Sequence, residues 1–322
     1  MVKISVVIPL YNKEKYIAET LQTVVDQTYR HFEVLIVDDG STDCSIDSVE
    51  PFLEDSRFKL IKQQNSGVSA ARNTGVRESR TNFIAFLDAD DLWMPDYLSK
   101  MQEAIEKFPD CVMFNSAGIV RNADNSEYVR QIKKYSSKIC LNDFFENPHV
   151  ALHTSATVVS KDAFNKVGGF PVGMKRNQDF ALFFSIAFYG KTTFVGFPLS
   201  LYNGACEGQA TRTPTRQVQS HIVDRYNFVH QQYLKNRKTE NKSYLVFLQY
   251  ELRHSLMIMR YEKELESFTY FIENLDRDIL KRFFFFEKTY FGKDILNSMA
   301  RMFTLATKVL WRMRGYPRVG AD

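Results

Sequence analysis

Apolar runs and helix-like periodicities alternate along the first 120 residues of the chain. Short, mostly apolar runs predict strands, and these fall at Lys3–Ile8, Glu33–Val37, Phe58–Ile61, Phe83–Leu87 and Cys111–Ile119. Apolar residues at helical spacing predict the helices between them, at Glu14–Thr28, after Asp43, at Val68–Glu78 and from Pro95 to about Lys107. Such βαβ alternation is typical of a parallel sheet with helices on both faces.

The pattern changes twice in the rest of the chain. Residues 121–150 are polar and irregular, and strand and helix patterns then resume up to a predicted strand at Thr192–Phe197. From about Gln217 the chain shows long helical patterns rich in Tyr, Phe, Lys and Arg. We therefore predict an α/β domain over residues 1–210 and a helical region over residues 211–322.

Three carboxylates follow the predicted strand that ends at Leu87. The run Asp88-Ala89-Asp90-Asp91 would stand at the carboxyl edge of a parallel sheet, where open α/β sheets bind ligands. An Asp-x-Asp pair with a small central residue can bind one compact cation, and carboxylate oxygens are ligands that Mg²⁺ and Mn²⁺ prefer. A cation that carries a diphosphate is the candidate ligand, which indicates chemistry on a nucleotide-linked substrate.

Cysteine usage and hydropathy bear on the compartment. Four cysteines without a C-x-x-C pair indicate neither a disulfide framework nor a zinc site, and they fit a reducing compartment. The first residues read as a strand rather than a signal peptide, and no run approaches the roughly 18–20 apolar residues that cross a bilayer. We expect a cytoplasmic protein, either free or peripheral on the cytoplasmic face of the membrane.

The basic residues gather at the end of the chain. From Lys281 onward nine Lys and Arg stand against three Asp and Glu, a net charge of +6. The whole chain carries +4, so residues 1–280 carry −2. The basic residues interleave with apolar ones on one short segment, which fits nucleic-acid binding poorly.

This basic segment contains a predicted amphipathic helix, Ile295–Arg314. Its predicted apolar side holds Leu296, Met299, Phe303, Ala306, Leu310 and Met313, and its polar side holds Asn297, Arg301, Thr304, Lys308 and Arg312. Phe283–Phe286 could extend the apolar side. Residues 283–314 therefore either contact an anionic membrane or pack their apolar face on protein, which would be the catalytic domain or a second subunit.

Four segments in fixed order carry a family resemblance. They are Ser5–Asn12 (SVVIPLYN), Val37–Asp43 (VDDGSTD), Asn65–Gly75 (NSGVSAARNTG) and Phe86–Asp91 (FLDADD). Together they closely resemble family 2 glycosyltransferases over roughly residues 1–205. The resemblance implies the α/β GT-A fold, a Rossmann-like, mostly parallel sheet with flanking helices. It also implies a nucleotide-sugar donor, with UDP as the expected nucleotide and Mn²⁺ or Mg²⁺ as the cation.

The resemblance assigns the nucleotide base to the first two segments. Asp39 matches the carboxylate that accepts a hydrogen bond from the uracil ring in family members, and Pro9 and Tyr11 would line the same pocket. Asp also favours turns and helix caps. That structural role explains Asp38 and Asp43 at least as well as ligand contact does, whereas for Asp39 we favour the nucleotide.

The diphosphate and the sugar are assigned to the last two segments. By the resemblance, Asp88 would contact the ribose or the donor sugar, and Asp90 would bind the metal in a DXD motif. Arg72 could reach the ribose or phosphates as a fixed cation, or it could form a surface ion pair. Capping of the turn before Pro95 explains Asp91 adequately.

The general base is assigned to Asp179. Family members place it in a Glu-Asp pair shortly after a Gly-Gly-Phe turn, and here Gly168-Gly169-Phe170 is followed by Gln178-Asp179. Gln178 departs from the common Glu, which leaves the base intact and puts only an auxiliary carboxylate in doubt. Alternatively, Asp179 could simply be the N-cap of a helix over Phe180–Tyr189.

We predict a metal-dependent, inverting glycosyltransferase that moves one sugar to a hydroxyl of a cell-surface glycan or lipid-linked acceptor, alone or as a homo-oligomer. The Q-x-x-R-W motif of processive synthases is absent. A sugar-nucleotide pyrophosphorylase would need a Gly-rich, basic loop where the chain has Pro9–Asn12, and a dehydrogenase would need G-x-G-x-x-G there. A silent nucleotide-sugar-binding protein or membrane adaptor is the non-enzymatic alternative, and the intact Asp39, Asp88, Asp90 and Asp179 count against it.

Overall fold

The computed structural model describes residues 3–146, 148, 152–174, 176–206, 215–236, 241–290 and 295–313. The chain divides into two compact units. Unit 1 comprises Met1–Phe144, Val150–Gly173 and Gln178–Gln209, and unit 2 comprises Phe145–His149, Met174–Asn177 and Ala210–Asp322.

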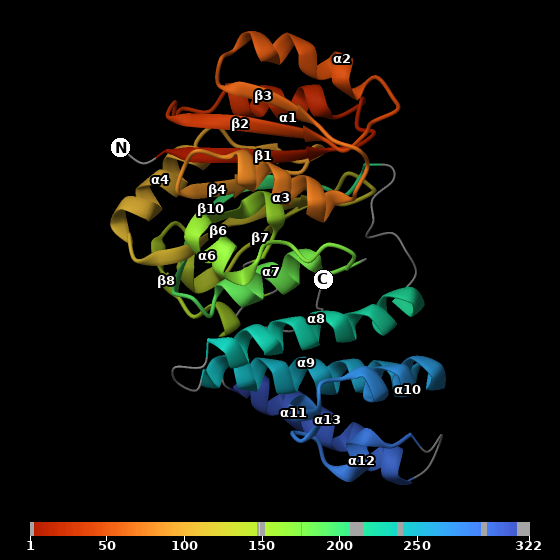
Figure 1. Ribbon diagram of the computed structural model, residues 1–322. Coiled ribbons are helices and arrows are strands. Elements are labelled where there is room, and N and C mark those ends of the chain that lie inside the picture. Colours follow the sequence, from red (N-terminus) through yellow and green to blue (C-terminus); the bar gives the residue numbers. More distant parts are fainter. Residues whose placement is uncertain are drawn as a thin grey trace. The chain divides into compact units, whose positions relative to one another are not determined.

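Unit 1 is built on a ten-stranded sheet flanked by helices (Figure 1). The strands are β1 (Ile4–Leu10), β2 (Phe32–Asp38), β3 (Phe58–Lys62), β4 (Phe83–Phe86), β5 (Leu92–Trp93), β6 (Cys111–Arg121), β7 (Glu127–Arg130), β8 (Ile139–Asn142), β9 (Thr157–Ser160) and β10 (Lys191–Asn203). The helices are α1 (Ile17–Val25), α2 (Ser45–Val49), α3 (Val68–Glu78), α4 (Tyr97–Lys107), α6 (Lys161–Val167) and α7 (Gln178–Ile186).

The main path of the sheet is β3-β2-β1-β4-β9-β6-β10-β5. Strands β1 to β4 pair in parallel, as does β10 with β6, whereas β9 is antiparallel to both of its neighbours. The expected mostly parallel α/β sheet is confirmed. The prediction that residues 121–150 are irregular was wrong in part, because β7 and β8 add antiparallel edges to β6 and β10.

Helices cover both faces of the parallel strands because β1 and β2 are apolar on both sides. Alternate residues Ile4, Val6 and Ile8 belong to a core that also contains Leu21 of α1 and Met101 of α4. On the other face α3 lies very close to the sheet. A Cβ on Gly75 would stand 2.4 Å from a methyl group of Val7, so only glycine fits this contact.

The strand register brings three loops to one edge of the sheet. Leu10 at the end of β1 pairs with Asp38 at the end of β2, and Val7 pairs with Phe86 at the end of β4. The segments that follow these strands carry the polar motifs found in the sequence. The carboxyl edge is therefore where the candidate site has to be sought.

Unit 2 is helical. It contains α8 (Thr215–Lys235), α9 (Lys242–Tyr261), α10 (Leu265–Asn274), α11 (Arg277–Leu280), α12 (Phe285–Lys288) and α13 (Ile295–Met313). Buried ion pairs tie these helices together, with 2.8 Å between Arg225 and Glu251 and 2.7 Å between Arg253 and Glu287. Among the residues that the structure describes, no helix is long and apolar enough to cross a membrane.

Candidate active site

The loop after β1 is fastened to the loop after β2. Asn12, in a left-handed conformation with φ of 51°, accepts a hydrogen bond from the Thr42 backbone N–H through its Oδ1. The backbone N–H of Lys13 donates to Ser45 Oγ at 2.7 Å. These bonds fix the backbone of Lys13, whose Nζ lies 2.6 Å from Asp90 Oδ2 after β4.

Lys13 and Asp90 form a largely buried ion pair at the sheet edge. Burial lowers the pKa of the Lys13 ammonium, but the hydrogen bond and charge of Asp90 outweigh burial and raise that pKa. Burial raises the pKa of Asp90, as does the neighbouring Asp91, although Lys13 opposes both effects. Burial and Asp90 raise the pKa of the nearby Cys206 thiol to about 11, so this thiol is protonated at neutral pH when no metal is bound.

Asp88 has a different cationic partner. Arg72 of α3 places Nη2 2.5 Å from Asp88 Oδ1, and its side chain is only 5% exposed. The Arg72 guanidinium also lies 5.1 Å from the ring centroid of Phe170. Its Nε is buried and has no hydrogen-bond partner among the described residues. The ion pair offered as an alternative for Arg72 is therefore observed, but its expected location was wrong, because Arg72 is buried and not at the surface.

The Gly-Gly-Phe turn is clamped onto α3 by a single side chain. Asn73 Nδ2 donates to the Phe170 carbonyl and Asn73 Oδ1 accepts from the Phe170 N–H, both at 2.9 Å. Gly169, with φ of 81°, approaches Asn73 so closely that a Cβ would be 2.7 Å from Oδ1. The Phe170 ring packs edge-on against Phe86 and Phe183, and Phe183 belongs to α7. This packing holds α7 against the end of β4.

Helix α7 carries Asp179 in its first turn, so Asp179 is not the N-cap considered from the sequence. Burial raises the pKa of Asp179. A hydrogen bond from the Phe180 N–H and the charge of Arg72 act in the opposite direction, and the charge of Asp88 adds to the increase. Asp179, Arg72 and Asp88 therefore share one electrostatic environment.

Asp91 links several segments of unit 1 through hydrogen bonds. Its carboxylate accepts hydrogen bonds from Ser155 Oγ at 2.5 Å and from the Asn203 N–H at 3.1 Å, and His153 Nε2 lies 3.3 Å away. The same Ser155 Oγ accepts a bond from the Asp88 N–H. Asp91 thus holds together the ends of β4 and β10 and the 3₁₀ segment Thr154–Ala156, instead of capping the turn before Pro95.

The Asp38-Asp39 pair shapes the loops beside the site. Asp38 accepts a bond from the Ser41 N–H, which closes a turn. Asp39 is buried and accepts three bonds, from Gln63 Nε2 and from the N–H groups of Ser66 and Gly67. A carboxylate has about four acceptor positions, so Asp39 keeps room for about one further donor.

The remaining predicted pocket residues stand beside this pair. Pro9 of β1 pairs in register with Val37, and Tyr11 follows at the same edge with 48% of its surface exposed. Asp43, just before α2, accepts bonds from the N–H and hydroxyl of Ser45 and from the Glu14 N–H, so its carboxylate joins the two loops. The structural role considered for Asp43 is thus observed.

The carboxylates fit a metal that arrives with its own ligands. In the described part of the chain, no three His, Cys, Asp or Glu side chains are grouped to hold an ion. Asp90 already binds a cationic group, the Lys13 ammonium, and only Ala89 separates it from Asp88 in the sequence. Mg²⁺ is commonly bound by one or two carboxylates with the phosphates of a substrate, and Asp88 and Asp90 suit that arrangement.

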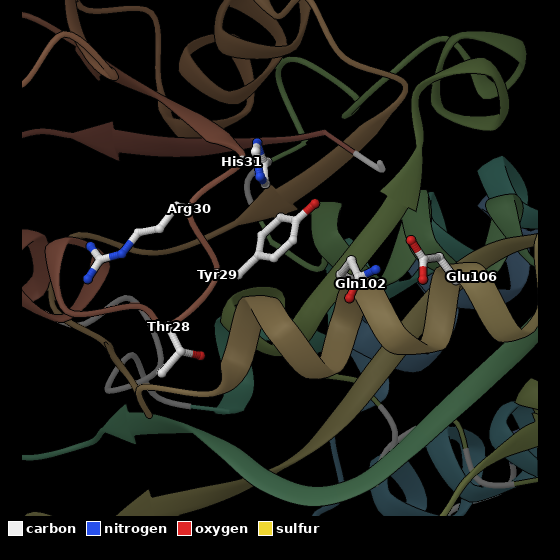
Figure 2. A pocket seen from close by; sticks show the side chains of 6 residues that line it. All are labelled: Thr28, Tyr29, Arg30, His31, Gln102 and Glu106. Carbon is white, nitrogen blue, oxygen red and sulfur yellow. The ribbon is translucent and has the colours of Figure 1, made fainter.

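A hollow of about 570 Å³ lies elsewhere in unit 1. Figure 2 shows its lining, which is Thr28, Tyr29, Arg30, His31, Gln102 and Glu106. His31 immediately precedes β2, whereas Asp38 ends that strand. The hollow therefore lies at the opposite edge of the sheet from the carboxylates and holds no carboxylate pair.

Three site residues were missed by the sequence analysis. The position of Lys13 could have indicated its role, because this cationic residue directly follows the motif at the end of the first strand. Asn73 stands beside Arg72 within the third motif, although nothing there indicates a bond to Phe170. Ser155 has no signal in the sequence.

Comparison with known proteins agrees with this geometry. Glycosyl transferase family 2 matches residues 5–168. Glycosyltransferase GlyA of Streptococcus pneumoniae is 40% identical over 107 residues, which cover 33% of this chain and 15% of that protein. Succinoglycan biosynthesis protein ExoW of Rhizobium meliloti is 32% identical over 201 residues, 57% of this chain and 63% of that protein. The chain thus spans less than two thirds of either relative.

A solved structure extends the likeness of fold to nearly the whole chain. Staphylococcus aureus TarS 1-349, crystallised in complex with UDP-GlcNAc, is 17% identical with a TM-score of 0.71. The match covers 98% of this chain and 93% of that one. At this identity the likeness concerns the fold, and it agrees with the expected GT-A architecture followed by a helical region.

Proposed function

The chain belongs to glycosyl transferase family 2 and is a glycosyltransferase. From this premise we propose that residues 1–210 form its catalytic domain. We place the nucleotide-sugar site at the carboxyl edge of β1, β2 and β4. The donor is a UDP-sugar. The observation that carries the proposal is the convergence of Arg72, Asp88 and Asp179 in one electrostatic environment. Solved structures of TarS with UDP and with UDP-GlcNAc support the choice of nucleotide.

The nucleoside binds near β1 and β2. Asp39 uses its remaining acceptor position for the imide N–H of uracil, and Pro9 and Tyr11 flank the base. Because the other three bonds of Asp39 hold it in place, its orientation is set before the ligand binds. A base without a donor at that position would leave a buried acceptor unpaired, which favours uracil.

The diphosphate and sugar lie at the end of β4. Asp88 faces the ribose or the donor sugar, with Arg72 neutralising its charge and offering its unpaired Nε. Asp90, together with Asp88, would hold Mn²⁺ or Mg²⁺. When bound, such an ion neutralises the negative charge that develops on the departing diphosphate. Lys13 supplies a second cation at the same carboxylate.

Transfer proceeds with inversion. The acceptor hydroxyl attacks the anomeric carbon, the bond from that carbon to the diphosphate oxygen breaks, and UDP leaves with the bonding electrons. Asp179 takes the proton of the hydroxyl. Its raised pKa makes it a stronger base than an ordinary carboxylate, which suits this role at neutral pH.

The acceptor is a hydroxyl of a cell-surface glycan or of a lipid-linked saccharide. The relative ExoW is a succinoglycan biosynthesis protein, which supports a role in a polysaccharide pathway. All four cysteines are free thiols, which supports a reducing, cytoplasmic setting.

The test is release of UDP from a panel of UDP-sugars in the presence of simple methyl glycosides, with nuclear magnetic resonance of the product. We expect turnover with one donor, an inverted anomeric configuration, and about 10²–10⁴-fold slower turnover in Asp179→Asn. A product with retained configuration would contradict the mechanism. UDP binding without turnover of any donor would favour the silent binding protein instead.

A further inference from the structure

Helix α13 of unit 2 exposes a continuous apolar face. Ile295, Met302 and Val309 are 79%, 69% and 56% exposed, and they recur every seven residues along one side of the helix. Three more exposed apolar residues belong to the same helix, namely Met299, Leu305 and Leu310. Phe284 and Phe285, at the start of α12, are 52% and 71% exposed.

The packing of α13 uses a different side of the helix. Arg260 of α9 donates to Asn297 Oδ1 at 3.0 Å, and Arg253 of α9 donates to Thr307 Oγ1 at 2.9 Å. Ala300, between them on the same side, is fully buried. The helix is thus anchored to α9 through small and polar residues, which leaves Ile295, Met302 and Val309 exposed.

This arrangement corrects the sequence-based division of α13 into two sides. Phe303 was expected beside Met299 and Leu310, but its ring packs edge-on against Phe284 at 5.2 Å and lies under the Arg253 guanidinium. Membrane contact and packing on protein were treated as alternatives for this helix. The helix packs on α9 through one side and exposes apolar residues on another.

Basic residues border the exposed face. At about 100° per residue, Arg301, Lys308 and Arg312 occupy one arc of α13 next to the arc of Ile295, Met302 and Val309. Helix α13 contains no Asp or Glu. An apolar face with basic residues along one side is complementary to a surface that is apolar in depth and anionic at its boundary.

Phe284 contacts the packed face of α13 through Phe303, so the two exposed segments belong to one surface. We propose that this surface, formed by Phe284, Phe285 and the outward face of α13, is a docking site for a membrane that carries anionic lipids. The helix lies in the headgroup region with its apolar residues directed to the acyl chains. A second copy of the chain is a poorer occupant, since twofold contact would bring two basic borders of like charge to one interface.

Flotation of the full chain with phosphatidylcholine vesicles, with and without phosphatidylglycerol, tests the proposal. We expect binding to the anionic vesicles that weakens at high salt. Phe285→Asp, Met302→Asp and Val309→Asp together should weaken this binding by about tenfold or more, because they place charge among the acyl chains. Arg301→Gln, Lys308→Gln and Arg312→Gln together should remove the preference for phosphatidylglycerol.

Two controls keep the outcome interpretable. Val172→Asp changes an apolar residue of unit 1 that is 64% exposed, and it should float like the wild type. Thermal unfolding by circular dichroism should be unchanged in every variant, since all substituted side chains on the apolar face are exposed. Wild-type protein that floats with neither vesicle would overturn the proposal. So would a wild-type dimer in light scattering that the Asp variant converts to monomer.

Discussion

The Lys13 ammonium lies 2.6 Å from Asp90 Oδ2, on the carboxylate that the DXD motif assigns to a metal. The two residues are 77 positions apart, and the pair forms because the loop after β1 is fastened to the loop after β2. The protein thus carries its own cation at the place where a divalent ion is expected. On the proposal that Asp90 binds a divalent ion, Lys13 and that ion would compete for the Asp90 carboxylate until the diphosphate provides further ligands.

Lys13→Met should therefore raise the affinity of the nucleotide-free protein for Mn²⁺ by about tenfold, equivalent to about 1.4 kcal/mol. It should also weaken UDP binding, since a cation near the diphosphate is lost. Calorimetry with Mn²⁺ alone, and with UDP at a saturating Mn²⁺ concentration, measures the two effects separately. Lys15→Met removes a more exposed cation from the same loop and should change neither value. Unchanged Mn²⁺ affinity in Lys13→Met would refute the competition.

Asn73→Ala should slow turnover while leaving UDP affinity unchanged. The substitution removes both hydrogen bonds that fix Phe170, so α7 and its Asp179 are no longer held in position relative to Arg72 and Asp88. A misplacement of about 1 Å can cost about 100-fold in rate, and we expect a decrease in kcat of that order. Thr74→Ala, one residue later on α3, is the matched control. A parallel loss of UDP affinity would instead indicate that α3 itself is disturbed.

The acidic limb of the pH profile should report Asp179. Because burial raises its pKa, kcat/KM should fall as pH decreases through a value above the ordinary Asp pKa of about 3.9. The sign follows from the role, since the base must be unprotonated to act. An acidic limb with an apparent pKa at or below the ordinary Asp value would show that a less buried group controls the rate. Asp179→Asn should abolish the limb together with most of the activity.

Gly75→Ala should destabilise unit 1 by about 1–3 kcal/mol, as overpacking does in well-packed cores. The added Cβ would stand 2.4 Å and 3.3 Å from methyl groups of Val7 and Val37, and both strands are held by the sheet. Urea unfolding followed by circular dichroism gives the free energy difference, with Thr74→Ala as the reference. Equal stability of Gly75→Ala and the wild type would mean that α3 can move away from β1.

The local pattern of apolar and polar residues was sufficient to predict most of the secondary structure of unit 1. The apolar runs predicted β1 to β4 to within two residues of their ends, and helical spacing predicted α3 over its full length. Strands β7 and β8 were missed because each has only four residues and lies at a sheet edge, where polar residues are tolerated.

The partners of the site residues were harder to predict. Burial of Arg72 depends on the Phe170 ring, which folds back from nearly 100 residues further along the chain. The three donors to Asp39 come from the loop after β3, whose path no periodicity encodes. On α13 the composition indicated an apolar face, but which part of that face is packed depends on where Arg253 and Arg260 reach it.

The most direct test of the nucleotide-sugar site is calorimetric binding of UDP, GDP and dTDP, with and without Mn²⁺, to the wild type and to Asp90→Asn. Asp162→Asn, a change of an exposed carboxylate on α6, serves as the control. We predict Mn²⁺-dependent binding of UDP that Asp90→Asn abolishes and Asp162→Asn preserves. Absence of binding for all three nucleotides, or UDP binding indifferent to Mn²⁺ and to Asp90, would contradict the account.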